Sequence, residues 1–425
     1  MVAYGPISVT ATGTGDHAFY VHGTGVKLQS ASDITISATQ GNWGLTMYDN
    51  SLIQSTGGNI SITTSGSSGG MWDSTTGGIV ASNNTASPTS ATPTSGGGLT
   101  LNATGAGDKG AYVVTGSLIS YGPMLLTTRS TAAAEGLYVA GSGVFRSVGA
   151  MTIDASTTGA ATGFVLENSR VMQSTAGNIS VTGVGNVGAY MNGSIVASND
   201  TTNPTTATPT SGGSLTINAT GSSSYGAIIY NGSLISYGPM SLTSRGTGAY
   251  QGLYVAGTGA FKSVGALTID SATTGAQWGV DLESSRVIQS TAGNVSVTGV
   301  GDYGIYMNGS IVASNDTTNP TTATPTSGGT LTLNATGRTN YGLKLAAGSL
   351  VSNGAMSLTG TGLYPGLYIY GTGGVKSNGN ITLNGTATPI TLRLNWSGTA
   401  ATIDASSTID VTGTITVAGV MLGDD

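Results

Sequence analysis

The sequence predicts an all-β fold, a right-handed parallel β-helix (β-solenoid) with three short strands per coil. Three observations predict it: apolar residues alternate with small polar ones over short runs, glycine-rich corners separate the runs, and the pattern repeats along the chain. Alternation with a period of two places one set of side chains on one face of a strand. A helical stripe with a period of 3.6 residues does not occur, and frequent Gly, Ser and Thr disfavour helices.

The longest repeat in the sequence is 116 residues. The segment SLISYGPM starts at Ser117 and again at Ser233, and SLVSNGAM starts at Ser349. Fixed periods are typical of solenoids, in which each unit packs on the unit before it. We therefore expect one continuous solenoid with four parts: a divergent first super-repeat (1–116), a second (117–232), a third (233–348) and a partial fourth (349–425).

Three series of apolar residues define the three strands of each coil. The first series contains pairs such as Met240/Leu242, and the second contains pairs such as Leu253/Val255. The third series consists of single apolar residues that are each followed two positions later by Ser, and its members in the third super-repeat are Leu234, Phe261, Ile288, Val312 and Leu350. The spacing predicts about 15 coils, or a rod about 70 Å long at roughly 4.8 Å per coil. The crossover rule favours the right-handed form.

The serines that follow the third series are expected to face the interior. A buried hydroxyl needs a hydrogen-bond partner, and a neighbouring serine in a stack can supply one. We therefore predict a structural ladder rather than a set of nucleophiles, with members that include Ser120, Ser147, Ser174, Ser198 and Ser236.

A stretch rich in Thr, Ser and Pro interrupts every fourth coil. The sequence SNDTTNPTTATPTSGG occupies 198–213 and returns unchanged at 314–329, while a close version occupies 82–97. Pro resists both helix and strand, and the stretch has almost no charge or apolar bulk. We expect it to bulge outward as an exposed loop. Its candidate contact residues are Pro204, Pro209, Pro320 and Pro325.

Composition excludes several classes of function. The net charge is −6, which argues against nucleic-acid binding. The sequence contains no apolar stretch of the roughly 20 residues that a membrane helix needs. The chain has no Cys, so a secreted protein of this size must depend on backbone ladders and packing rather than on disulfides.

Residues suited to catalysis are sparse. The best local group of carboxylates is Asp270, Asp281 and Glu283, with Arg286 close by in sequence. Glu–Arg pairs three residues apart, Glu167/Arg170 and Glu283/Arg286, are interpreted as exposed ion pairs of little energetic weight. We expect neither an enzyme nor a bound cofactor.

The remaining charged and titratable groups also have a structural interpretation. The two histidines, His17 and His22, lack the clustered partners that a metal site requires. A sparse basic row of one residue per super-repeat is interpreted as solvated charge, and it consists of Arg146, Lys262 and Lys376.

The second strand of alternate coils carries a tyrosine between two inward-facing apolar residues, as in GLYVAG and GIYMNG. Each tyrosine should therefore point outward, and a row of exposed rings can stack on sugars or on apolar partner surfaces. The alternative is that each ring packs on its neighbours and covers the backbone. The candidate binding face comprises Tyr138, Tyr190, Tyr254, Tyr306 and Tyr368.

The coil sequence IQSTAGNVSVTGVGDYGIYMNGS (288–310) resembles the repeats of filamentous-haemagglutinin-like exoproteins and bacterial autotransporter adhesins. The segments SLTINATG (214–221) and STIDVTGTITVAG (407–419) resemble them too. The resemblance implies a secreted, extracellular stalk at the bacterial cell surface, built as a right-handed β-helix. It brings no catalytic residues.

Three functions follow from these expectations. The first is a non-catalytic structural stalk of a surface adhesin, whose partners are host or cell-surface glycans and proteins. The second is a subunit that assembles end to end or laterally with copies of itself into an extracellular fibre or matrix. The third is a polysaccharide-binding or depolymerising β-helix.

Overall fold

The computed structural model describes residues 1–167, 170–283, 286–323, 325–364, 366–369, 374–386, 392–394, 409–411 and 415–418. These residues form parallel strands that stack as a β-solenoid of about 14 turns, which confirms the predicted fold class. The chain divides into two compact units, Met1–Ala219 and Thr220–Asp425, and the division falls within β21 (Leu215–Gly221). Among the described segments there is no helix long and apolar enough to cross a membrane.

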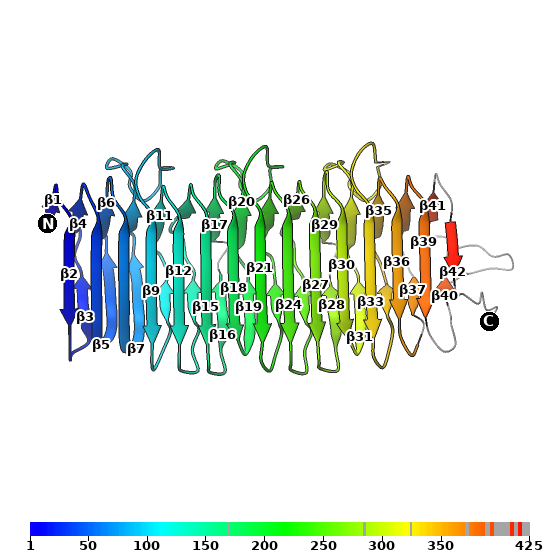
Figure 1. Cartoon of the computed structure of the whole chain (residues 1–425), viewed down its shortest axis with the longest axis horizontal. Helices are drawn as coiled ribbons and strands as arrows, with labels where there is room; N and C mark the ends of the chain where they lie inside the picture. Colours follow the sequence, from blue (N-terminus) through cyan, green and yellow to red (C-terminus); the bar gives the residue numbers. More distant parts are fainter. Residues whose placement is uncertain are drawn as a thin grey trace. The chain divides into compact units, whose positions relative to one another are not determined.

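One turn of the first unit illustrates the arrangement. It consists of β12 (Met124–Ser130), β13 (Leu137–Val139) and β14 (Phe145–Ser147). The next turn repeats it as β15 (Met151–Thr157), β16 (Thr162–Leu166) and β17 (Val171–Ser174), and each strand pairs in parallel with its counterpart in the turn before. Figure 1 shows the long strands of each unit side by side.

The other strands of the first unit follow the same order. The first strands of its turns are β2 (Ile7–Thr12), β5 (Ile34–Asp49), β7 (Ile60–Thr75), β9 (Leu99–Gly105) and β18 (Ile179–Gly185). The second strands are β3 (His17–Val21), β10 (Ala111–Val113) and β19 (Val187–Met191). The third strands are β1 (Val2–Ala3), β4 (Lys27–Ser30), β6 (Leu52–Ser55), β8 (Gly78–Ala81), β11 (Ser117–Ser120) and β20 (Ser194–Ala197).

The second unit has the same three series. Its first strands are β24 (Met240–Gly246), β27 (Leu267–Thr273), β30 (Val295–Gly301), β33 (Leu331–Gly337), β36 (Met356–Thr361), β39 (Ile381–Thr386) and β42 (Ile415–Ala418). Its second strands are β22 (Ala227–Ile229), β25 (Leu253–Val255), β28 (Trp278–Leu282), β31 (Tyr303–Met307), β34 (Leu343–Leu345), β37 (Leu367–Ile369) and β40 (Leu392–Leu394). Its third strands are β23 (Leu234–Ser236), β26 (Phe261–Ser263), β29 (Val287–Ser290), β32 (Ser310–Ala313), β35 (Ser349–Ser352), β38 (Gly374–Ser377) and β41 (Ile409–Val411).

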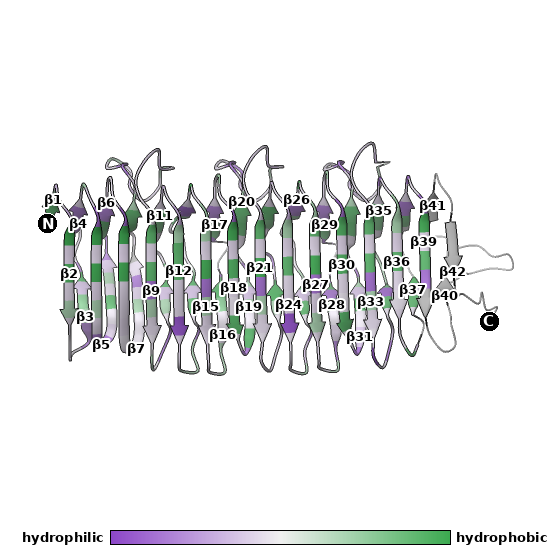
Figure 2. Cartoon of the chain, viewed as in Figure 1, coloured by the Kyte–Doolittle hydropathy of each residue, from purple (hydrophilic) through white to green (hydrophobic). Residues whose placement is uncertain are grey.

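The core consists of the inward-facing residues of all three strand series. The predicted pairs are buried as expected: Met240 and Leu242 are 2% and 1% exposed, and Leu253 and Val255 are fully buried. Apolar and polar residues therefore alternate along the long strands, as Figure 2 shows. In β5 and β7 the first and second strands of the coil run on as one strand. The register in which β5 pairs with β7 shifts between Ala38 and Trp43.

The prediction for the third series of apolar residues is wrong by one position at Val312. Ile311, not Val312, lies in register with Ile288 and Leu350, so Val312 belongs to the opposite, outward side of β32. The cause is that β32 reads Ser-Ile-Val-Ala, two adjacent apolar residues that alternation alone cannot separate.

The serine ladder is correspondingly interrupted. Ser120 and Ser147 stack in register, with their Oγ atoms 3.2 Å apart, and both also donate to corner glycine carbonyls. The position in register with Ser174 is Ala197 rather than Ser198. Ser198 is buried, but its Oγ accepts the amide of Asp200 at 3.2 Å and begins the following loop.

Candidate functional site

The predicted tyrosines do point outward from the second strands, but none lies free on the surface. Tyr138, Tyr190, Tyr254, Tyr306 and Tyr368 are each half-buried between two buried neighbours. They fall on alternate turns, because the positions between them in register are Val165 in the first unit and Asp281 and Lys344 in the second.

In the first unit the outward rings pack on one another. Trp72, Tyr112 and Tyr138 are in register on three successive turns, and the neighbouring ring centroids are 5.1 Å apart. The Lys109 ammonium lies 5.1 Å from the Tyr112 ring centroid and 5.9 Å from that of Tyr138. The stack therefore covers the wall of the solenoid as well as presenting aromatic edges.

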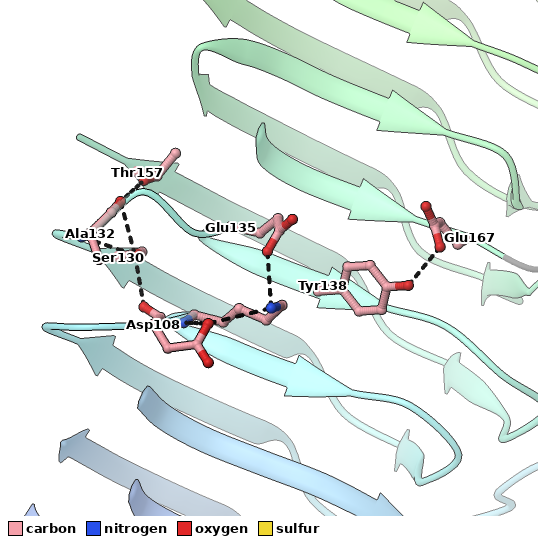
Figure 3. Close-up of polar contacts among 8 residues, drawn as sticks. Asp108, Ser130, Ala132, Glu135, Tyr138, Thr157 and Glu167 are labelled. Carbon is pink, nitrogen blue, oxygen red and sulfur yellow. Dashed lines mark hydrogen bonds and ion pairs between the residues drawn. The ribbon is translucent and has the colours of Figure 1, made fainter. Parts of the chain in front are cut away.

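The hydroxyl of Tyr138 is also engaged. It donates to Glu167 Oε2 at 2.6 Å, and Lys109 lies between Asp108 and Glu135, 3.3 Å from each carboxylate (Figure 3). Burial, together with this hydrogen bond and the charge of Glu167, raises the pKa of Tyr138 well above its ordinary value. These contacts fasten both the ring and the hydroxyl of Tyr138 to the wall.

The second unit places a carboxylate in the same outward row. Asp281 is in register between Tyr254 and Tyr306 and is only 4% exposed. Its Oδ2 accepts from Gln251 Nε2 at 2.9 Å, whereas its buried Oδ1 has no partner among the described residues. Burial raises the pKa of Asp281 to about 7, an effect that the Gln251 hydrogen bond opposes.

The predicted Glu–Arg ion pairs are not formed, and this interpretation is corrected. Arg170 and Arg286 are each 3% exposed and donate to backbone carbonyls of earlier turns. Arg170 reaches Ala140 O at 2.5 Å, Val114 O at 3.2 Å and also Gly116 O, and Arg286 reaches Ala256 O at 2.7 Å and also Gly232 O. They connect turns within the solenoid.

The carboxylates considered for catalysis are dispersed. Asp270 pairs with Arg245 from the preceding turn, and Asp154 pairs with Arg129 in the same way. His22 pairs with Asp49 at 3.0 Å, and His17 contacts the Thr46 hydroxyl at 2.8 Å. Among the described residues, no group of three or more His, Cys, Asp or Glu side chains could hold a metal ion.

The Thr/Pro stretches are folded loops with a shared closure. In the 198–213 loop, Asn199 and Ser211 exchange hydrogen bonds of 3.1 and 3.2 Å at the neck. Gln173 from the preceding turn donates to Ser198 O at 2.9 Å and to Asp200 O at 2.6 Å. The same contacts recur in the 314–329 loop, where Gln289 donates to Ser314 O and Asp316 O.

The prolines of each loop differ in exposure. Pro209 and Pro325 are buried, whereas Pro204 and Pro320 are half-buried. Pro325 O accepts from Asn378 Nδ2 at 2.6 Å, which ties the last loop to a later turn. In each loop the second proline therefore belongs to the packed base, and the first proline lies nearer the solvent.

The basic row is not simply solvated charge, and this interpretation is also corrected. Arg146 Nη1 donates to Thr92 Oγ1 at 3.0 Å and to Ser90 O at 3.4 Å, so its guanidinium holds the 82–97 loop. Lys376 Nζ approaches Thr322 O at 3.4 Å in the 314–329 loop. Burial lowers the pKa of both Arg146 and Lys262.

The 82–97 loop also lies beside an apolar patch on the outer side of the wall. Val80 and Ile119 face outward in register with Arg146, yet both are fully buried. They form a cluster with Leu52, against which Val144 packs. Since Ser117 Oγ donates to Thr89 O of the loop at 3.2 Å, the loop folds back over these strands instead of extending into solvent.

An open pocket of about 670 Å³ lies between the 198–213 loop and the turn that carries Arg146. We name it the inter-loop pocket. Arg146, Arg170 and Gln173 line it from the solenoid wall, and Thr201, Thr202 and Pro204 line it from the loop. Among the described residues that line the pocket none is acidic.

Sequence reasoning did not predict the roles of Gln173 and Arg170. Both residues recur unchanged 116 positions later, as Gln289 and Arg286, but a repeat preserves structural and functional residues alike. A signal was present in the long side chains: a buried Gln in a short strand and a buried Arg just before it must find hydrogen-bond partners. The glutamine meets carbonyls of the loop that starts one turn later, and the arginine meets carbonyls of earlier turns.

The stacked turns define the chain as a β-solenoid repeat protein. No protein-family model, curated protein or solved structure matches it.

Proposed function

We propose that the chain is a non-catalytic structural stalk of an extracellular bacterial surface adhesin or exoprotein. The observation that carries the proposal is that each turn pairs with the next through backbone and side-chain hydrogen bonds. Backbone ladders join the turns in register, and buried side chains such as Gln173 and Arg170 join turns that are one or two apart. A stalk requires this continuity because load must pass from turn to turn.

The folded loops support the same proposal. Asn, Gln and Pro residues at equivalent positions fasten each loop at its neck and base, and those of the last two loops are 116 residues apart. Ordered loops at a fixed spacing along a stalk give it a regular edge, which can protect the wall or contact neighbouring molecules. The resemblance of the coil sequence to adhesin repeats supports the extracellular setting.

Electron microscopy of the whole chain and of a shortened chain tests the proposal. Deleting residues 117–232 joins Gly116 to Ser233 in the register of the repeat and removes four turns. We expect separate rods of about 70 Å for the chain and about 50 Å for the variant, at roughly 4.8 Å per turn.

Three results would count against the stalk. Globular particles, or equal lengths for the two proteins, would contradict it directly. Filaments whose length grows with protein concentration would favour the alternative, a self-assembling fibre subunit.

A further inference from the structure

The inter-loop pocket places the Arg146 guanidinium beside hydroxyl groups, and no acidic side chain is among the described residues that line it. Arg146 forms no ion pair with a described residue, and its Nη2 makes no hydrogen bond within the described part of the chain. Its Nη1 is held by Thr92 and Ser90, so the guanidinium is fixed before a ligand arrives. A fixed and partly desolvated guanidinium is suited to a carboxylate or another anion.

A second arginine lies at the pocket, but the buried carboxylate of Asp73 offsets part of its charge. Arg170, a second arginine at the pocket, is 97% removed from solvent and directs its Nη atoms to backbone carbonyls. Asp200 lies on the same loop as the pocket wall, but its Oδ1 accepts the amides of Thr202 and Asn203 at 2.9 and 2.8 Å. Arg146 is therefore the lining cation that forms no ion pair with a described residue, and the proposal rests on it.

The other lining groups match a polyhydroxylated ligand. Thr115, Ser142, Thr201 and Thr202 supply hydroxyls, and the Gln173 amide is held by the loop backbone. The ring of Pro204 offers an apolar surface for the C–H face of a sugar. The volume of about 670 Å³ falls within the range of small-ligand sites, roughly 300 to 1,000 Å³.

We propose that the inter-loop pocket binds an acidic sugar residue of a polysaccharide, with the sugar's anionic group at Arg146 and its hydroxyls at the Thr, Ser and Gln side chains. The site is distinct from the tyrosine row, and it does not depend on whether the chain acts as a stalk. The favoured occupant is a saccharide rather than an acidic peptide, because hydroxyl and proline groups surround the cation.

The second unit repeats the residues of this site. Lys262 stands 116 positions after Arg146, and Arg286, Gln289, Thr317, Thr318 and Pro320 stand at the other equivalent positions. Arg286 and Gln289 donate to the equivalent backbone carbonyls. A lysine in place of arginine keeps the charge but loses the planar fork, so we expect the second site to be the weaker one.

Calorimetric titration of the full chain with a tetrameric oligogalacturonate tests the proposal. The test variant is Arg146→Ala/Lys262→Ala, which removes the proposed anion-binding cation from each site and leaves Arg170 and Arg286 in place. The matched control is Arg129→Ala/Arg245→Ala, because these arginines share the 116-residue spacing and the same loss of charge but pair with Asp154 and Asp270 outside the pocket. Circular dichroism and melting establish that each variant is folded.

We expect the test variant to bind at least tenfold more weakly, and the control to remain within about twofold of the wild type. Affinity should fall with salt, as for an ionic contact. The methyl-esterified oligosaccharide should not bind, and Arg146→Lys should weaken binding less than Arg146→Ala.

Several results decide the matter. Tighter binding of a sulfated oligosaccharide that also depends on Arg146 would support the site and identify the anion as sulfate. The proposal is overturned if the oligogalacturonate does not bind, if both double variants bind alike, if the neutral ester binds equally well, or if a polyglutamate peptide binds as tightly.

Discussion

Asp281 replaces an apolar residue in an otherwise repetitive wall. The equivalent position 116 residues earlier is Val165, which is 5% exposed and also faces outward between two tyrosines in register. A carboxylate in that position loses hydration, and the Gln251 amide restores only part of it. Its pKa of about 7 makes Asp281 a source of pH dependence in the second unit.

The first prediction concerns the stability of the protein between pH 4 and 8. The folded-state pKa of Asp281 lies above its unfolded value of 3.8, so the folded state holds the proton more tightly. Stability should therefore fall as pH rises from about 4 to about 7, by on the order of 4 kcal/mol, and then change no further from this group.

Reciprocal substitutions at the two equivalent positions check this prediction. Asp281→Val should remove the decline and raise the melting temperature at pH 8, whereas Val165→Asp should introduce a decline in the first unit. Melting curves across the pH range provide the measurement. An unchanged pH profile in Asp281→Val would show that the carboxylate is not the source.

Tyr138 provides a second prediction, because its ring and its hydroxyl both have partners in the wall. Tyr138→Phe should cost about 1 kcal/mol through the lost hydrogen bond to Glu167, and Tyr138→Ala about 2 kcal/mol through the lost packing as well. Chemical denaturation measures both. Tyr4→Ala is the control, since Tyr4 is 96% exposed; equal stability of Tyr138→Ala and the wild type would favour a pure binding face.

At the scale of the element, the 82–97 loop is expected to cover an apolar patch of the wall, because it hydrogen-bonds to the strand that carries Ile119. Val80 and Ile119 face outward and are still fully buried beside the 82–97 loop. Replacing residues 84–94 with two glycines should leave the Asn83–Ser95 neck closed and expose this apolar patch. We expect increased binding of a hydrophobic dye, a lower melting temperature and a tendency to associate.

A control that changes only the loop surface tests whether any change in the loop is enough to expose the apolar patch. Thr85→Gly and Ala86→Gly change two exposed residues and should leave dye binding unchanged. If the shortened loop also left dye binding unchanged, other residues would have to cover Val80 and Ile119.

The glutamine at the base of each loop yields a fourth prediction. Gln173→Leu removes two hydrogen bonds from the 198–213 loop, and Gln289→Leu does the same for the 314–329 loop. Each substitution should reduce amide protection in its own loop by about 1–3 kcal/mol and leave the other loop unaffected. Hydrogen exchange measures both loops in one sample, and equal loosening of both loops would contradict local clamping.

The elements also show what could be predicted from sequence. Alternation located the strands around Met240 and Leu253, because a serine or a tyrosine separates the two inward apolar positions of each strand. It failed at Ile311 and Val312, where two apolar residues adjoin and both are buried. Composition indicated exposed loops and solvated charge, but it could not indicate that Arg146 holds the 82–97 loop, because that contact joins residues 54 positions apart.

At the scale of the whole molecule, the 116-residue period is the basis for expecting one continuous solenoid. The equivalent residues Thr35 and Thr152 lie four turns apart within the first unit. Successive parallel pairing connects their strands in the order β5, β7, β9, β12 and β15. Thr268 and Thr382 lie four turns apart within the second unit. Thr152 and Thr268 are separated by one sequence period.

The measurement that tests this claim most directly is the distance between spin labels at these threonines. The chain has no Cys, so pairs of introduced cysteines are unique attachment points. At roughly 4.8 Å per turn, Thr35→Cys/Thr268→Cys should give a narrow distribution near 38 Å, and Thr35→Cys/Thr382→Cys one near 58 Å. Broad distributions, or distances that do not increase in proportion to the number of turns, would contradict a continuous solenoid and the stalk that depends on it.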